Sequence, residues 1–175
     1  MSPMGDALLS QPIVPLDDSH DRRSFHCGVE PLDRYLQVQA GQDQRRRVSV
    51  CFVLNDAARS RIAGYYTLSA FSVIGEALPD ALQKKLPKYG QIPCTLLGRL
   101  AGDAEYRGLG LGRHLLLDAL QRALLHSGEV ASWAVTVDAK DEAAERFYSR
   151  YGFIALPQTP RGLFLPMATI AELFR

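Results

Sequence analysis

Few cysteines, a single tryptophan and no long apolar run characterise this chain of 175 residues. No stretch reaches the roughly 20 apolar residues that a membrane-spanning helix needs, and the N-terminus lacks the charged-then-apolar order of a signal peptide. Cys27, Cys51 and Cys94 are odd in number, widely spaced and outside any metal-ligand pattern. We therefore predict a cytoplasmic protein with reduced thiols, no membrane association and no metal site.

Internal repeats and a convincing interdomain linker are also absent from the sequence. The length suits one ordinary domain with a proper core. The content of 47% hydrophobic and 22% charged residues is typical of a soluble globular protein. Because residues 1–15 show little pattern, we predict a flexible lead over 1–15 and a single domain over 16–175.

The net charge is only +1, so no protein-wide basic field indicates a nucleic-acid partner. The basic residues are nevertheless clustered, and arginine suits phosphate recognition because its planar fork can donate two hydrogen bonds to one group. The clusters that could contact a phosphate backbone are Arg45, Arg46 and Arg47, and Lys84, Lys85 and Lys88. A short charge run is more often a solvated helix end, and both interpretations stay open here.

Hydrophobic periodicity predicts an alternation of helices and strands. The predicted helices are a segment from Pro31 to the arginine triplet, a polar connector over 79–88, residues 111–127, residues 141–150 and a tail after Pro166. The predicted strands are 48–54, 61–73, 92–101, 131–137, 153–156 and 162–165, of which the first two form an antiparallel hairpin. The strand–helix–strand order over 92–137 implies a parallel pair in an otherwise antiparallel sheet, and hence an α+β fold.

Alternating glycines stand between the strand over 92–101 and the strongest predicted helix, in the segment Arg107-Gly108-Leu109-Gly110-Leu111-Gly112-Arg113. Glycines let a ligand approach the backbone, and a helix start presents free amides and the positive end of the dipole, so the segment predicts a pyrophosphate site. The spacing fits neither a Walker loop nor a dinucleotide fingerprint. A glycine-rich turn without a ligand stays the alternative.

A second motif runs from Asp141 to Phe153 and contains Phe147-Tyr148. Asp141 is placed to cap a helix that ends before Gly152, with Ala144 and Phe147 on its inward face. Tyr148 is then either a functional hydroxyl or a core tyrosine whose polar end reaches the surface.

The two motifs together resemble the GNAT acetyltransferase superfamily, whose loop reads Arg/Gln-x-x-Gly-x-Gly. The resemblance implies a mixed, mostly antiparallel sheet with a splayed parallel strand pair flanked by helices, and acetyl-CoA as the cofactor. It implies Tyr148 as the general acid that protonates the departing sulfur. The implied cofactor-binding residues are Leu100, Ala101, Arg107, Gly108, Leu109, Gly110, Leu111, Gly112, Arg113 and Asp141.

A narrower resemblance covers the N-terminal half as well, in segments that begin at Phe25, Leu32, Gly64, Leu97 and Leu163. They are similar to the acetyltransferase toxins of bacterial toxin–antitoxin modules. That family acetylates the α-amine of aminoacyl-tRNA, blocks translation and is neutralised by a ribbon-helix-helix antitoxin.

The same resemblance implies a homodimer, to which the apolar residues Ile170, Leu173 and Phe174 could contribute. Two positions depart from the family: His26 replaces a common aspartate, and Asp138 replaces a frequent histidine. These departures leave the implied cofactor site intact.

An α-amine acceptor suits a chain without a committed catalytic base, because its pKa near ~8 leaves it partly neutral, whereas a lysine amine lies near ~10.4. Asp103 and Glu105 could relay a proton or simply cap the glycine loop in solvent. Two alternatives remain open: a GNAT enzyme for a small amine or a protein N-terminus, and a non-catalytic acyl-CoA-binding regulatory module.

Overall fold

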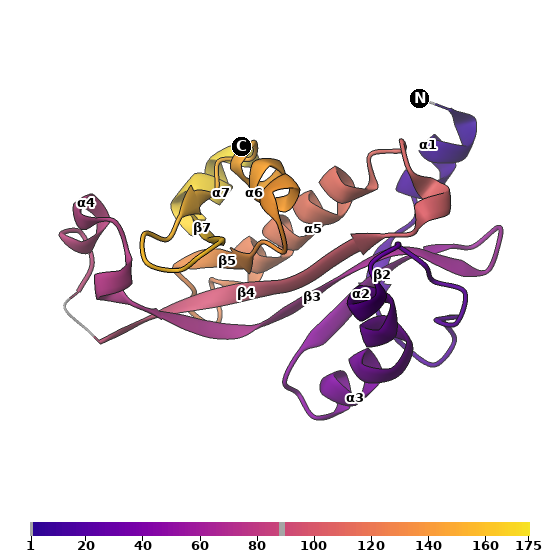
Figure 1. Cartoon of the computed structure of the whole chain (residues 1–175), viewed down its shortest axis with the longest axis horizontal. Coiled ribbons are helices and arrows are strands. Elements are labelled where there is room, and N and C mark those ends of the chain that lie inside the picture. The colour runs from indigo at the N-terminus through magenta and orange to yellow at the C-terminus, as the bar shows by residue number, and fades with distance from the viewer. Residues whose placement is uncertain (1, 88–89) are drawn as a thin grey trace. The chain divides into compact units, whose positions relative to one another are not determined.

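A computed structural model describes residues 2–87 and 90–175, and its elements follow the predicted order (Figure 1). The helical elements are α1 (Pro3–Leu9), α2 (Glu30–Arg34), η1 (Tyr35–Gln39), α3 (Ala40–Arg45), η2 (Gly75–Ala77), α4 (Asp80–Gln83), η3 (Ala104–Tyr106), α5 (Leu111–His126), α6 (Glu142–Ser149) and α7 (Met167–Leu173). The strands are β1 (Ile13–Pro15), β2 (Val50–Asp56), β3 (Arg61–Ile74), β4 (Gln91–Gly102), β5 (Ala134–Asp138), β6 (Ile154–Ala155) and β7 (Gly162–Pro166).

The strands of the described residues form one mixed sheet of seven in the order β1-β2-β3-β4-β5-β7-β6. β4 and β5 are parallel, whereas β1–β2, β2–β3, β5–β7 and β6–β7 are antiparallel. This confirms the predicted α+β class with one parallel pair. The chain divides into a first unit, up to Ser69 with Gly98–Ala119, and a second unit, Ala70–Leu97 with Leu120–Arg175.

In the first unit, the helical run from α2 to α3 packs on one face of the strands. Its inward residues Tyr35, Leu36 and Ala40 join Tyr65 of β3 and Ala101 of β4 in one buried cluster. The rings of Tyr35 and Tyr65 stack at 6.5 Å between their centroids. The predicted helix after Pro31 is therefore confirmed, and η1 is a π-helical turn in its middle.

Within the segment predicted as a flexible lead over 1–15, the structure describes a helix, α1, and a strand, β1. The Ser2 side chain caps α1 by accepting a hydrogen bond from the Gly5 amide at 3.2 Å, and Leu8 is buried. β1 pairs with β2 from Ile13–Leu54 to Pro15–Phe52. A three-residue strand is too short to show a period of two, and a proline is tolerated because β1 lies at the sheet edge.

The second unit is built on β5, whose residues Ala134, Val135, Thr136 and Val137 are all buried. A buried parallel strand has a nearly continuous apolar sequence, and this strand has one apart from its threonine. The Trp133 ring stacks on Phe164 of β7 at 5.6 Å. The predicted strand over 131–137 begins three residues later than expected, at Ala134.

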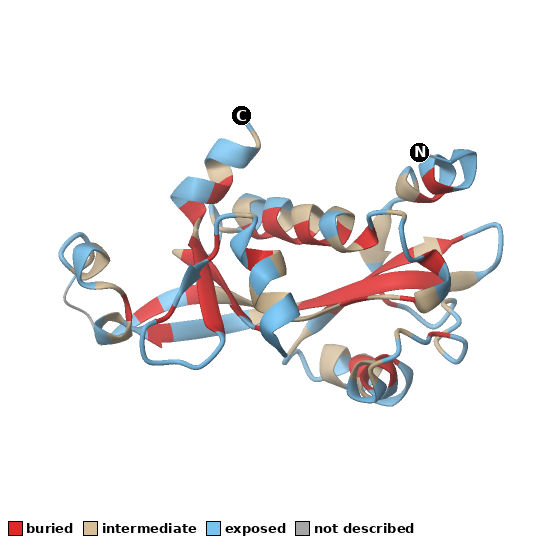
Figure 2. Ribbon diagram, turned by 45° about the horizontal axis from the view of Figure 1, so that its top comes forward, coloured by how far each residue is buried: buried red, intermediate tan, exposed pale blue. Residues whose placement is uncertain are grey.

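Helix α5 confirms its predicted apolar face, with buried residues at 115, 116, 119, 120 and 123. Figure 2 shows these buried positions on one side of the helix and further buried residues along the strands. No helix within residues 2–87 and 90–175 is both long and apolar enough to cross a membrane.

Candidate functional site

The glycine loop joins the end of β4 to the start of α5 in the first unit. Gly108 and Gly110 have φ angles of +82° and +77°, which favour glycine, and a Cβ on either would meet no atom within 4 Å. The His114 amide donates to the Gly110 carbonyl at 3.1 Å, so the amides of residues 111–113 precede the first intrahelical bond. The loop thus presents a helix start towards open space, which fits an anionic ligand.

A buried carboxylate holds this loop in place. Asp103, which is 2% exposed, accepts hydrogen bonds of 2.9 Å from Arg61 Nη2 and from the His26 and Glu105 amides. Arg61 also pairs with Glu105 at 2.9 Å. The sequence predicts Asp103 in solvent, as a cap of the glycine loop; Asp103 instead caps η3 and is buried, because the Arg61 guanidinium compensates its charge.

Tyr106 anchors the other side of the same turn. Its side chain is 1% exposed, and its hydroxyl donates to Asp56 Oδ2 of β2 at 2.7 Å. Burial, together with this contact, raises the pKa of Tyr106 to about 12. The base of the loop is therefore fixed from two neighbouring strands.

Arg107 is exposed and lies beside the segment His26-Cys27-Gly28. A Cβ at Gly28, whose φ is +94°, would come within 3.5 Å of Arg107 Nη2. Asp33 holds the segment by accepting a hydrogen bond from the Cys27 amide at 2.7 Å. His26, where the sequence departs from the pattern expected of the toxins, contacts Asp33 through its ring and Asp103 through its backbone amide. This departure therefore lies beside the residues that hold the glycine loop.

The end of β4 has two different faces in the first unit. Ala101 belongs to the cluster under α2 and α3, whereas Gly102 faces α5, since its Cβ would lie 3.5 Å from Leu111. Leu100 is half-buried. Arg99, which no sequence motif indicates, stacks its guanidinium on the Tyr35 ring at 3.4 Å. The sequence could not indicate this contact, because a single arginine in a strand looks the same whether it stacks on a ring or extends into solvent.

Tyr148 lies on α6 in the second unit. Asp141 caps this helix as predicted, accepting a hydrogen bond from the Ala144 amide at 2.8 Å. Tyr148 is 8% exposed, and its ring contacts Phe147 and Phe153 edge-on at 5.1 and 5.3 Å. Burial raises the pKa of Tyr148 to about 12, so its hydroxyl keeps its proton at neutral pH.

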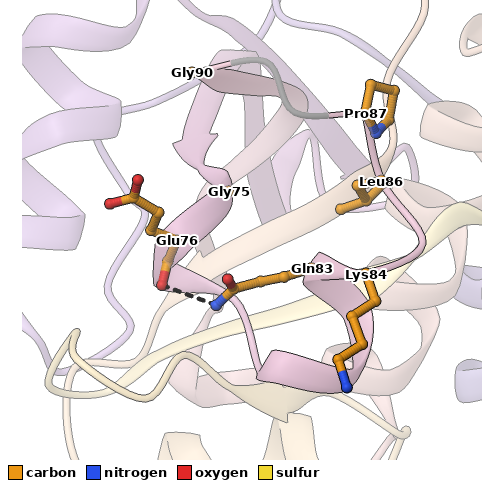
Figure 3. Close-up of a pocket in the computed structure, with 7 residues that line it drawn as sticks. All are labelled: Gly75, Glu76, Gln83, Lys84, Leu86, Pro87 and Gly90. Atoms are coloured by element: carbon orange, nitrogen blue, oxygen red, sulfur yellow. Dashed lines mark hydrogen bonds between the residues drawn. The ribbon is translucent and has the colours of Figure 1, made fainter.

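The basic clusters are exposed where the structure describes them. Arg45, Arg46 and Arg47 end the run of α3, and Arg47 adopts a φ of +61°. Lys84 and Lys85 follow α4, whereas Lys88 lies outside the described residues. Lys84 borders a cavity of about 440 Å³, and its side chain points away from Gln83 and Glu76 (Figure 3). The arginine and lysine clusters belong to different units, and their convergence stays a prediction.

The apolar tail after Pro166 forms α7, which packs on β7. Ile170 is fully buried within its own chain, whereas Leu173 is 47% exposed. In the described part of the chain, no group of three or more His, Cys, Asp or Glu residues is arranged to hold a metal ion.

Comparison with known proteins assigns the class to which this loop and this sheet belong. The chain is a member of the acetyltransferase (GNAT) family, whose pattern matches residues 20–153. The chain is 31% identical to the probable toxin TacT of Sinorhizobium fredii, with 92% of this chain and 93% of the relative covered. It is 34% identical to the tRNA-acetylating toxin of Mycobacterium tuberculosis, with 87% and 89% covered.

Solved structures give the same result. A crystal structure of a tyrosine-to-phenylalanine mutant of KacT matches with a TM-score of 0.87 and 32% identity, covering 93% of this chain and 98% of KacT. AtaT complexed with acetyl-methionyl-tRNAfMet matches with a TM-score of 0.86 and 32% identity, covering 94% of this chain and 99% of AtaT. AtaTR bound with acetyl-CoA matches with a TM-score of 0.82 and 32% identity, covering 94% of this chain and 98% of the matched chain. The predicted GNAT fold and the predicted similarity to the toxins are confirmed.

Proposed function

We propose that this protein is an acetyl-CoA-dependent toxin that acetylates the α-amine of aminoacyl-tRNA and so blocks translation. The observation that carries the proposal is the similarity over nearly the whole chain to a tRNA-acetylating toxin and to AtaT in complex with acetyl-methionyl-tRNAfMet. The match covers 94% of the chain, so it includes the segment around His26 and the helices α2 and α3 as well as the glycine loop.

The glycine loop fits the pyrophosphate of acetyl-CoA. The open space next to the Cα atoms of Gly108 and Gly110 leaves room for a diphosphate. The backbone amides of residues 109–112 supply hydrogen-bond donors, and the exposed Arg107 and Arg113 supply positive charge. The backbone around Leu100 and Ala101 would orient the thioester. Bound there, acetyl-CoA supplies an activated acyl group that an amine can take directly.

Tyr148 Oη is the proposed proton source for the departing sulfur. Because burial raises its pKa to about 12, the hydroxyl is protonated at neutral pH and can donate. Asp141 orients α6 through its cap, and we propose that it contributes to the cofactor site by positioning this helix rather than by direct charge.

The toxin is proposed to act in the cytoplasm, paired with an antitoxin of the ribbon-helix-helix type. A tyrosine-to-phenylalanine mutant of AtaT was solved bound to the C-terminus of the antitoxin AtaR, which supports a partner that contacts the enzyme through its C-terminal segment. We also propose a homodimer. Leu173 remains exposed and available for such contact, whereas Ile170 is already buried in its own chain.

The direct test is incubation of the purified protein with labelled acetyl-CoA and total charged tRNA. We expect label in the charged tRNA and none in deacylated tRNA, because deacylation removes the acceptor amine. Label that enters only small amines or protein N-termini would replace this proposal with the generic acetyltransferase function. Binding of acetyl-CoA without any transfer would leave a regulatory module.

A further inference from the structure

A cavity of about 210 Å³ lies within the second unit, beside the end of the parallel pairing of β4 with β5. The last of these pairs joins Leu96 to Thr136, and both residues line the cavity. Leu156 and Thr159, from the chain between β6 and β7, form another part of its wall. Every lining residue belongs to the second unit, so the cavity is a property of that unit alone.

A glycine lets this wall close over the strands. A Cβ at Gly162 of β7 would come within 2.7 Å of Thr159 and within 3.2 Å of Leu156. A side chain at position 162 would therefore displace two residues that line the cavity. Gly162 pairs with Asp138 of β5, so no cross-strand side chain from β7 fills the space beside the Asp138 carboxylate.

Thr136 gives the cavity an unsatisfied polar group. The residue is 2% exposed, and its Oγ1 has no hydrogen-bond partner within residues 2–87 and 90–175. Buried hydroxyl groups in proteins are normally paired. Rotation about χ1 exchanges the positions of the hydroxyl and the methyl group on a threonine Cβ, so this hydroxyl can turn towards a polar group in the cavity.

Among the described residues, Asp138 is the one charged residue that lines the cavity. Its carboxylate is exposed, and because it stands two residues after Thr136 in β5, both side chains lie on the same face of the strand. Most of the remaining wall is apolar and includes Phe71, Val73 and Ile74 of β3. A single carboxylate beside an apolar wall attracts a cation and repels an anion.

We propose that this cavity binds a small organic cation, namely a primary ammonium on an aliphatic stem that ends in a hydroxyl group. The ammonium pairs with Asp138, the stem lies against the apolar wall, and the terminal hydroxyl completes the hydrogen bonding of Thr136. Binding of such a ligand requires neither acetyl-CoA nor tRNA, and is therefore separate from the proposed function.

Spacing and volume limit the length of the stem. Residues two apart in a strand are separated by about 6.6 Å, and an extended stem of four carbon atoms holds its nitrogen and oxygen about 6 Å apart. A cavity of about 150 Å³ accepts a molecule of the size of benzene, so about 210 Å³ has room for about six to eight non-hydrogen atoms. The probe that fits both limits is 4-amino-1-butanol.

An NMR titration of the isotope-labelled protein with four matched compounds tests the proposal. The compounds are 4-amino-1-butanol, butylamine, which lacks the hydroxyl, 1,4-butanediol, which lacks the cation, and 4-hydroxybutyrate, which carries an anion in its place. We expect 4-amino-1-butanol to shift the resonances of the cavity residues. Butylamine and 1,4-butanediol should each bind at least about threefold more weakly, because one net hydrogen bond or one exposed ion pair is worth up to about fivefold.

The anion 4-hydroxybutyrate should not bind detectably. Equal affinity for all four compounds, tighter binding of the anion, shifts confined to residues away from the cavity, or no shifts at all would each overturn the proposal.

Two conservative variants assign the contacts. Thr136→Val removes the hydroxyl and should weaken 4-amino-1-butanol by at least about threefold while leaving butylamine unchanged. Asp138→Asn removes the charge and should weaken both amines while leaving 1,4-butanediol unchanged. Glu172→Gln, which removes an exposed carboxylate of α7, is the matched control and should change none of the affinities. Equal weakening of both amines by Thr136→Val, or no effect of Asp138→Asn, would contradict the assignment.

A third variant locates the binding in the cavity. Ala77 lines the cavity, so Ala77→Phe should fill it and abolish the binding of 4-amino-1-butanol. The matched change Ala81→Phe, on the exposed surface of α4, should preserve binding. Full affinity in Ala77→Phe that thermal unfolding shows to be folded would overturn the location. If Ala77→Phe does not fold, Thr136→Val and Asp138→Asn decide, because neither adds volume.

Discussion

In the proposed function, the burial of Tyr148 prepares this single residue for proton transfer. Its ring is enclosed by Phe147 and Phe153, and this apolar environment opposes ionisation of the hydroxyl. The hydroxyl is therefore a weak acid that remains fully protonated, which suits a donor to a thiolate that forms only as the bond breaks.

Replacing Tyr148 by phenylalanine should leave the fold and acetyl-CoA binding intact while the transfer rate falls by about 10²–10⁴-fold, the usual contribution of general acid catalysis. Single-turnover acetylation of charged tRNA, with calorimetry for the cofactor, measures both effects. Tyr151→Phe removes a hydroxyl from a half-buried ring near the same helix and serves as the control. A loss of less than about tenfold in Tyr148→Phe would reduce Tyr148 to a packing residue.

The pH dependence follows from the same residue. The acceptor amine must be neutral, so the rate should rise with pH until about pH 8, where an α-amine loses its proton. Tyr148 has its pKa raised to about 12, so it stays protonated well above that point. The rate should then remain level to about pH 10. A rate–pH profile that declines between pH 8 and 9 would show that another group supplies the proton.

At the scale of single elements, the loop between β4 and α5 depends on both its glycines and its buried anchor. Gly110→Asp should abolish acetyl-CoA binding, because a carboxylate would repel the pyrophosphate and the φ of +77° disfavours any side chain. Gly110→Ala imposes the backbone strain without the charge and should weaken binding less. Calorimetry that finds equal affinity in wild type and Gly110→Asp would remove the loop from the cofactor site.

The anchor itself can be tested through Asp103. Asp103→Ala removes three hydrogen bonds and leaves Arg61, whose side chain is 19% exposed, without its main partner. We expect the free energy of unfolding to fall by about 3 kcal/mol, as for a lost hydrogen-bonded charge pair. Urea unfolding measures this, and Glu105→Ala, which removes only the exposed partner, should cost less than about 1 kcal/mol. Equal losses would contradict the role of Asp103.

Most elements could be predicted because each carries a local pattern. The apolar face of α5, the Asp141 cap of α6 and the hairpin of β2 and β3 all follow from residue spacing. β1 could not be predicted, since three residues at a sheet edge depend on pairing with β2 and not on their own pattern. The burial of Asp103 could not be predicted either, because its partner Arg61 is 42 residues away in sequence.

At the scale of the whole molecule, the proposed recognition of tRNA depends on exposed positive charge. Phosphate contacts release counterions, so activity on charged tRNA should fall steeply as salt rises. Charge reversal of Arg46 and Arg47, both exposed beyond α3, should weaken tRNA acetylation and leave acetyl-CoA binding unaltered. Activity that is flat in salt and unaffected by both reversals would rule out this arginine cluster as a tRNA contact.

The class of the molecule could be predicted because the glycine loop and the Phe147-Tyr148 motif follow one another in the order typical of the GNAT family. The cavity of about 210 Å³ beside Thr136 could not be predicted in the same way. The cavity at Thr136 forms from β3, β4, β5 and the residues around Leu156, and no spacing along the chain indicates that these segments meet. Cavities arise from tertiary packing, and a single sequence shows packing only indirectly.

The chemical position of the transferred acetyl group tests the central claim most directly. Charged tRNA is acetylated with the purified protein, digested with nuclease, and the released aminoacyl-adenosine is analysed by fragmentation mass spectrometry. The account predicts one added acetyl group on the α-amine, and none when Tyr148→Phe replaces the wild type under the same single-turnover conditions. An acetyl group on the nucleobase, on the ribose or on no part of the tRNA would contradict it.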